Sequence, residues 1–170
     1  SITADPQSSI VNAGNPYDNH GYRGGILGCS LSNLLIWREL AQRSDLEDGD
    51  FYIVLEDDVW FRPGVLSAPL VFRTAYMGIA DDPRWQWLYL GFSTNGKSIL
   101  YGDSDVQPGV QRFASVSRSY GGGTFGYAIR KSGARHLLRM AAERGIPQAI
   151  DWHMIGEFRN VLAYKLSPLL

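Results

Sequence analysis

Apolar residues recur along this chain at two spacings, one typical of helices and one typical of buried strands. Over residues 27–41 they fall on one helical stripe, formed by Leu27, Leu31, Leu34 and Leu35. This spacing predicts a helix over residues 27–41. Two further helices are predicted over residues 65–80 and residues 152–158.

Another helix is predicted between these last two, because start and stop signals surround an apolar stripe. Ser132 is the expected N-cap, and Gly145 followed by Pro147 ends the helix. The core stripe of this helix is formed by Ala134, Leu137, Leu138 and Ala141.

Short, almost uniformly apolar runs alternate with these helices and predict buried strands. They cover residues 51–55, 85–90, 124–129 and 161–166. Residues 111–117 alternate weakly and predict an edge strand, whereas residues 1–25 and 92–110 are expected to be irregular. Alternating strands and helices predict an α/β fold with a mostly parallel sheet flanked by helices, in a single domain over residues 1–170.

Composition and charge exclude several classes of protein. The net charge is −1, so nothing indicates the strongly basic face of a nucleic-acid binder. Cys29 is the only cysteine, which excludes an internal disulfide and a cysteine-rich zinc site. No apolar run approaches the ~20 residues that span a bilayer, so no transmembrane segment is expected.

Three carboxylates, Glu56, Asp57 and Asp58, directly follow the strand predicted at residues 51–55. Ligands of α/β sheets bind beyond the carboxyl ends of strands. On an extended chain, Glu56 and Asp58 would face one side together and Asp57 the other. Two such oxygen ligands suit Mn²⁺ or Mg²⁺, and the cation would offset the repulsion between the carboxylates. The alternative is a solvated acidic turn.

Several segments, in order along the chain, together resemble one known family. They are residues 25–37, 52–58, 87–91, 126–138, 147–151 and 167–169. In the fourth, Gly133-Ala134 and Leu137-Leu138 are similar to a strand followed by a "GA-x-x-LL" helix. Each motif alone is weak evidence. Together, in this order, the motifs resemble glycosyltransferase family 25, which includes bacterial lipopolysaccharide glycosyltransferases and procollagen galactosyltransferases.

This resemblance implies a glycosyltransferase-A type fold and a metal-dependent, inverting transfer of a hexose, galactose or glucose. The donor would be a UDP-sugar, and the acceptor a glycan, a lipopolysaccharide or a hydroxylated protein. Glu56 and Asp58 would bind Mn²⁺ or Mg²⁺ and the donor, and Asp57 would assist them in catalysis. Asn33, Tyr120, Gly123 and Thr124 are the other expected donor or substrate contacts.

Two features near these residues allow two interpretations each. The glycines at residues 121–123 either let backbone amides approach a diphosphate or sugar closely, or form a flexible turn. Asp151 is either the N-cap of the helix at residues 152–158 or the base that deprotonates the acceptor hydroxyl. His153 is expected to be a packing or surface histidine, and Cys29 a small core residue.

The sequence also departs from the family pattern. Ile26 stands where the family usually has Glu, and Asn33 where it usually has His, although Asn can still hydrogen-bond. The family's first nucleotide-binding βα unit and a tail beyond the closing strand are not found within the 170 residues, so we expect a fragment or a degenerate member. A catalytically silent domain of the same fold, which binds glycans or partners, is therefore the alternative function.

Overall fold

The computed structural model describes residues 24–59, 68–94, 104–107, 110–112, 121–146, 149–157 and 160–166. Its helices are α1 (Gly24–Gln42), α2 (Ala68–Ile79), α3 (Lys131–Arg144) and α4 (Ile150–Gly156). Its strands are β1 (Phe51–Leu55), β2 (Trp85–Thr94), β3 (Ser104–Gln107), β4 (Val110–Arg112), β5 (Gly121–Arg130) and β6 (Leu162–Leu166). Within these ranges, no helix is long and apolar enough to cross a membrane.

The strands form one six-stranded mixed sheet in the order β1-β5-β2-β6-β4-β3. The prediction of a mostly parallel sheet is wrong, because β2 and β6 form the one parallel pair among these strands and the other four neighbouring pairs are antiparallel. The error has a physical cause. A strand buried on both faces is apolar throughout whether its neighbours are parallel or antiparallel, so an apolar run does not reveal strand direction.

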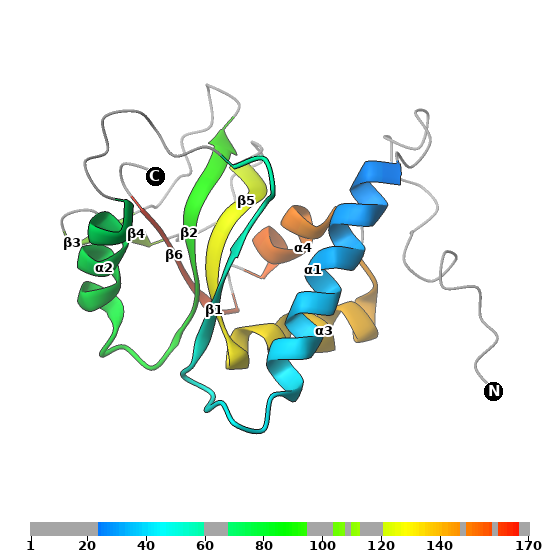
Figure 1. Cartoon of the computed structure of the whole chain (residues 1–170), viewed down its shortest axis with the longest axis horizontal. Helices are drawn as coiled ribbons and strands as arrows, with labels where there is room; N and C mark the ends of the chain where they lie inside the picture. Colours follow the sequence, from blue (N-terminus) through cyan, green and yellow to red (C-terminus); the bar gives the residue numbers. More distant parts are fainter. Residues whose placement is uncertain are drawn as a thin grey trace.

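The sheet is the middle layer of three, and this confirms the α/β class. Helices α1, α3 and α4 cover one face, and α2 covers the other (Figure 1). Successive residues of β2 alternate between the two cores: Trp87 and Tyr89 belong to the core under α1, α3 and α4, whereas Leu88 and Leu90 belong to the core under α2. Coverage on both faces explains why the strand sequences are almost continuously apolar.

Three strand predictions need correction. The strand predicted to be buried at residues 51–55 is β1, which lies at one end of the sheet and leaves Ile53 49% and Leu55 44% exposed. Residues 92–110 were expected to be irregular, but β2 continues to Thr94, and β3 and the start of β4 also lie within that range. The edge strand predicted at residues 111–117 begins earlier, as β4, and lies between β6 and β3 rather than at an edge. Residues 113–117 lie outside the described part of the chain.

Helix α1 forms where predicted but buries a different face. Its buried residues are Ser30, Asn33, Trp37 and Leu40, at helical spacing. Leu31 and Leu35, assigned to the core stripe from their spacing, are instead 43% and 54% exposed. Two of the four buried residues are polar and form hydrogen bonds or line a pocket, so a purely apolar criterion selected the wrong face.

Helix α3 begins without the Ser132 cap that its sequence suggested. Its N-cap is Arg130, with no side-chain cap, because β5 runs straight into the helix. The free amides are instead satisfied by a preceding loop: Lys131 N donates to Asp50 O over 2.8 Å, and Ser132 N to Asp48 O over 3.3 Å. The expected end is confirmed, since Gly145 at the C-cap has a φ of 72°.

Gly133 allows α3 to pack closely on β2. An added Cβ would lie 2.7 Å from the carbonyl oxygen of Gln86, closer than side-chain carbons approach backbone atoms. We expect Gly133→Ala to destabilise the protein by ~1–3 kcal/mol, because overlap outweighs the higher helix propensity of alanine. Urea unfolding measures this.

Gly28→Ala is the matched control. Gly28 also lies in a helix, but an added Cβ there meets no heavy atom within 4 Å. We expect this variant to be as stable as the wild type or more stable, by up to ~1 kcal/mol. Equal stability of the Gly133→Ala and Gly28→Ala variants would contradict the close-packing explanation.

His153 is a packing histidine, as predicted. It is 6% exposed, lies beside Trp37, and has Nε2 2.9 Å from the carbonyl oxygen of Leu137. Burial lowers the pKa of His153 below its ordinary value of 6.5, although the hydrogen bond with Leu137 opposes this. The neutral ring therefore stabilises the fold above pH 6.5, and this contribution is lost as the pH falls through the lowered pKa.

We therefore expect the melting temperature to fall between about pH 7.5 and about pH 5.5, and to fall less in His153→Gln, which keeps a donor for the Leu137 carbonyl. Glu157 does not interfere in this range. Burial raises its pKa, but hydrogen bonds from Asn160 and His136 lower it further, so the pKa lies below 4.5. A variant with the same pH dependence as the wild type would show that His153 is not the group responsible.

Candidate functional site

The acidic run and the glycine run meet at one edge of the sheet. Strand β5 runs antiparallel to β1, with Gly126 paired with Leu55, so the chain leaving β1 lies beside the chain entering β5. One backbone hydrogen bond, from Glu56 N to Phe125 O over 3.0 Å, continues this contact beyond the strand. The sheet thus brings Glu56 and Thr124 together although they are 68 residues apart.

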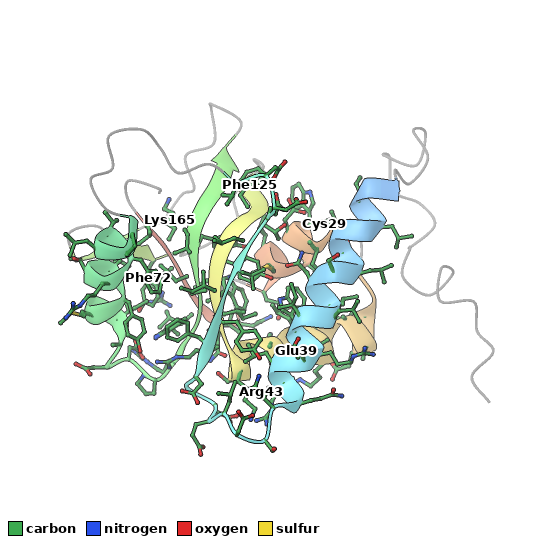
Figure 2. All side chains as sticks on the ribbon, viewed as in Figure 1. Cys29, Glu39, Arg43, Phe72, Phe125 and Lys165 are labelled. Carbon is green, nitrogen blue, oxygen red and sulfur yellow. The ribbon has the colours of Figure 1, made fainter. Side chains whose placement is uncertain are left out.

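A pocket of about 400 Å³ lies at this edge, within the size range of small-molecule sites. Its lining residues come from α1, from the end of β1, from the start of β5 and from the start of α4. They are Gly25, Ile26, Cys29, Ser30, Glu56, Gly123, Thr124, Phe125, Ala149, Ile150, Asp151 and Trp152. Figure 2 shows Cys29 on α1 and Phe125 on β5 at this end of the molecule, whereas Glu39 and Arg43 lie at the other end of α1.

Glu56 is the carboxylate of the acidic run that reaches the pocket. It is half-buried, and its Oε1 accepts a hydrogen bond from Thr124 Oγ1 over 2.7 Å. Cys29 Sγ lies 4.0 Å from the same oxygen and 3.5 Å from Thr124 Oγ1. No hydrogen bond joins the second oxygen, Oε2, to another of the described residues.

The extended geometry predicted for the three acids is wrong. The chain turns after β1, where Val59 N donates to Glu56 O over 3.3 Å, because the pairing with β5 ends at Leu55. Asp57 and Asp58 are exposed in this turn and do not line the pocket. The side chains of Glu56 and Asp58 therefore do not share a face in the way that an extended strand would require.

The donor atoms of this turn still fit a hard divalent cation. Mg²⁺ and similar ions bind one or two carboxylates and complete their coordination with substrate phosphates and water. Within the described ranges, no group of three or more His, Cys, Asp or Glu residues could hold a metal ion. An ion held at this turn would therefore need ligands from outside the described residues to complete its coordination.

Asp151 lies on the pocket wall and links α4 to β5. It is 8% exposed, Oδ1 accepts from Trp152 N over 2.9 Å, and Oδ2 accepts from Gly123 N over 3.2 Å. The N-cap interpretation is wrong, because α4 begins at Ile150 and its N-cap is Ala149. Asp151 instead occupies the first turn, with a carboxylate that is fixed by two backbone amides beside the pocket.

Gly123 has a structural reason to be glycine. Its φ is 106°, which side-chain-bearing residues rarely adopt, and an added Cβ would lie 2.8 Å from the ring of Phe125. The flexible-turn interpretation of residues 121–123 is wrong, since Gly121 and Gly122 of β5 pair with Thr94 and Ser93 of β2. The unusual backbone at Gly123 accompanies an amide that donates to Asp151, so this residue positions the carboxylate.

The remaining expected contacts differ in how they meet the pocket. Thr124 lines it, whereas Asn33 is 5% exposed and lies beneath the wall, where its Nδ2 donates to Cys29 O over 2.9 Å. Tyr120 lies outside the described residues. Cys29, expected to be a core residue, packs against the core but also lines the pocket. Its spacing of four residues from Asn33 on one helix was the signal that could have revealed this.

Comparison with known proteins identifies the family. The model of glycosyltransferase family 25 (LPS biosynthesis protein) matches residues 15–154. Procollagen galactosyltransferase 1-A of Xenopus laevis is 26% identical over 91% of this chain and 26% of its own length. A glycosyltransferase 25 family member of Anopheles gambiae is 30% identical, and the inactive glycosyltransferase 25 family member 3 of Homo sapiens is 26% identical, with the same coverage.

The chain spans about a quarter of the length of these curated relatives. No solved structure matches it. The family model, however, covers most of the chain, and it includes α1, the acidic run, the start of β5 and Asp151. The chain therefore belongs to glycosyltransferase family 25.

Proposed function

We propose that this chain forms the donor-side catalytic part of a glycosyltransferase. The enzyme transfers a hexose, galactose or glucose, from a UDP-sugar to a hydroxyl group of a glycan, a lipopolysaccharide or a hydroxylated protein. The observation that carries this proposal is that Glu56 and Asp151, 95 residues apart in sequence, line one pocket of small-molecule size. A relative named as a procollagen galactosyltransferase supports galactose as the first sugar to test.

The reaction proposed is a single in-line displacement with inversion at the anomeric carbon. The acceptor oxygen forms a bond to that carbon, the bond from the carbon to the UDP oxygen breaks, and UDP leaves with the bonding electrons. The acceptor proton passes to a base. Asp151 is proposed as that base, because backbone amides from Trp152 and Gly123 hold its carboxylate at the pocket.

Mn²⁺ or Mg²⁺ is the proposed cofactor, and when bound it supplies Lewis acidity to the leaving diphosphate. Glu56 and Asp58 would hold the ion together with phosphate oxygens, and Asp57 would add negative charge beside them. Thr124 supports this assignment, since its hydrogen bond fixes one oxygen of Glu56. Carboxylates at the end of β1 in a three-layer α/β/α structure also support the proposed glycosyltransferase-A type of fold.

A second candidate function is a catalytically silent binding domain. The specific observation in its favour is Ile26, which is 40% exposed and places an apolar side chain on the pocket wall. A relative from Homo sapiens is named an inactive member of the family, which supports this candidate. Manganese-dependent binding of UDP separates the two, because a silent domain has no need of it.

Asp58→Asn tests the metal assignment. We expect it to weaken manganese-dependent UDP binding by about 10-fold or more, the loss seen when even an indirect partner of a metal ligand is removed. The melting temperature should barely change, because Asp58 is exposed. Titration calorimetry of UDP with Mn²⁺ measures the affinity. Asp81→Asn, which alters an exposed acid beyond α2, is the control, and equal affinities in both variants would remove Asp58 from the site.

Asp151→Asn tests the base. Each oxygen of Asp151 accepts one backbone amide, and Asn has a single oxygen, so one of these contacts is lost. We expect a stability loss of ~1–3 kcal/mol together with a ~10²–10⁴-fold fall in transfer rate. The rate is measured at saturating donor, well below the melting temperature, in the longest natural protein that contains this chain.

The affinity for UDP is the control for Asp151→Asn, since the change removes no ligand of the diphosphate. We expect it to stay close to that of the wild type. A variant that keeps most of its transfer rate would show that Asp151 is not the base. His153 is then no substitute, because its Nε2 hydrogen-bonds Leu137 O inside the core, away from the lining of the pocket.

A further inference from the structure

Three buried side chains beneath the pocket are joined by hydrogen bonds. Trp37 Nε1 donates to the Tyr127 hydroxyl over 2.9 Å, and that hydroxyl donates to Asn33 Oδ1. Trp37 and Tyr127 are fully buried, and Asn33 is 5% exposed. A buried polar group without a partner is destabilising, so these bonds hold the three side chains in fixed orientations.

The same chain of contacts continues to the pocket wall. Asn33 Nδ2 lies 3.6 Å from Cys29 Sγ, and Cys29 Sγ lies 3.5 Å from Thr124 Oγ1. Thr124 Oγ1 then donates to Glu56 Oε1 over 2.7 Å. The contacts therefore connect the core beneath α1, through the start of β5, to the carboxylate at the end of β1.

The groups at the two ends, the Trp37 indole and the Glu56 carboxylate, determine which partner donates in each hydrogen bond. An indole N–H only donates, so the Tyr127 hydroxyl accepts from Trp37 and gives its own proton to Asn33. The amide oxygen of Asn33 is then committed, and its NH₂ group faces Cys29. The backbone carbonyl of Cys29, which only accepts, requires the same amide orientation.

At the other end, an ionised carboxylate only accepts. Thr124 therefore gives its proton to Glu56, and the Cys29 thiol, which lies 3.5 Å from Thr124 Oγ1 and 4.0 Å from Glu56 Oε1, donates toward these two oxygens. Burial raises the pKa of the Tyr127 hydroxyl, although the hydrogen bond from Trp37 opposes this, so the Tyr127 proton stays in place. Bonds that all point the same way strengthen one another.

We propose that Asn33 is a positioning residue for Glu56, with its amide orientation set by Tyr127 and transmitted through Cys29 and Thr124. The chain commits Oε1 of Glu56 to Thr124 and leaves Oε2 for a ligand. This proposal rests on the proposed function in one respect, namely that Glu56 binds the metal and donor. It assigns Asn33 a role behind the pocket wall, in place of direct donor contact.

A purely structural role is the alternative, in which these bonds only satisfy buried polar groups. Both roles lower stability when Tyr127 is changed, so stability does not separate them. Coupling does separate them. If Tyr127 acts on Glu56 through Thr124, then Thr124→Val breaks the chain of contacts. Adding Tyr127→Phe to that variant should then lower the affinity for UDP little further.

The experiment is a double-mutant cycle of Tyr127→Phe and Thr124→Val, with the affinity for UDP in the presence of Mn²⁺ as its readout. We expect each single variant to bind about 5–10-fold more weakly, the worth of one hydrogen bond, and the double variant to bind no more weakly than Thr124→Val alone. Thr124→Ser keeps the hydroxyl and should restore the affinity. Independent losses that multiply in the double variant would overturn the proposal.

Tyr89→Phe is the matched control, because its ring lies 6.4 Å from that of Tyr127 in the same core. It removes a tyrosine hydroxyl outside the contacts that lead to Glu56, so its effect should be independent of Thr124→Val. If Tyr127→Phe does not fold, Cys29 offers a half-buried position for the same test. Cys29→Ala breaks the chain of contacts, and Cys29→Ser keeps it. Cys29→Ser should bind UDP as the wild type does and Cys29→Ala more weakly; equal affinity in both would overturn the proposal.

Cys29 also provides a readout that does not depend on the proposed function. It is the only cysteine and lines the pocket, so a small maleimide reports its surroundings directly at a fixed pH. We expect Tyr127→Phe to change the labelling rate by about 3-fold or more, as one altered hydrogen bond would, and Tyr89→Phe to leave it unchanged. A wild type without UDP affinity would refute the proposed function alone, whereas an unchanged labelling rate in Tyr127→Phe would refute the positioning role.

Discussion

The antiparallel insertion of β5 between β1 and β2 is the constraint on which the site depends. Because β5 enters the sheet at the edge where β1 leaves it, its first residues lie beside Glu56. A parallel β5 would enter at the opposite edge and take Thr124 away from the acidic run. The same strand supplies the Gly123 amide to Asp151 and runs without a break into α3, so a single element organises the pocket and the packing beneath it.

The sequence was informative wherever one physical effect dominated. The positions of β1 and α1 along the chain could be predicted because apolar runs and helical spacing are local signals. Their burial could not, since Ile53 and Leu55 of β1 are exposed and α1 buries a different face from the one expected. The position of Glu56 beside a pocket followed from the general rule for strand ends. Strand direction and the turn after Leu55 could not be predicted, because both depend on pairing with β5, a segment about 70 residues away in sequence.

Polar residues in the core explain the largest local misinterpretation. Helix α1 exposes Leu31 and Leu35 and buries Asn33, the reverse of the pattern expected from hydrophobicity. Burying an amide brings stability only if its donors and acceptor are all satisfied, and here Tyr127 and Cys29 satisfy them. An apolar residue at this position would fill the space with less risk, so the polar arrangement indicates a demand for orientation as well as stability.

The interactions that maintain the fold differ from those that the proposed reaction requires. Gly133, at the contact of α3 with β2, and the Trp37–Tyr127 hydrogen bond stabilise the structure whether or not a ligand binds. The contacts from Cys29 to Glu56 lie at the pocket wall, although Cys29 also packs against the core. A silent member of the family would therefore be free to lose the contacts at the pocket wall, the second group, while it keeps the interactions that stabilise the fold, the first group. This chain has both groups, and that combination favours the enzyme over the silent domain despite Ile26.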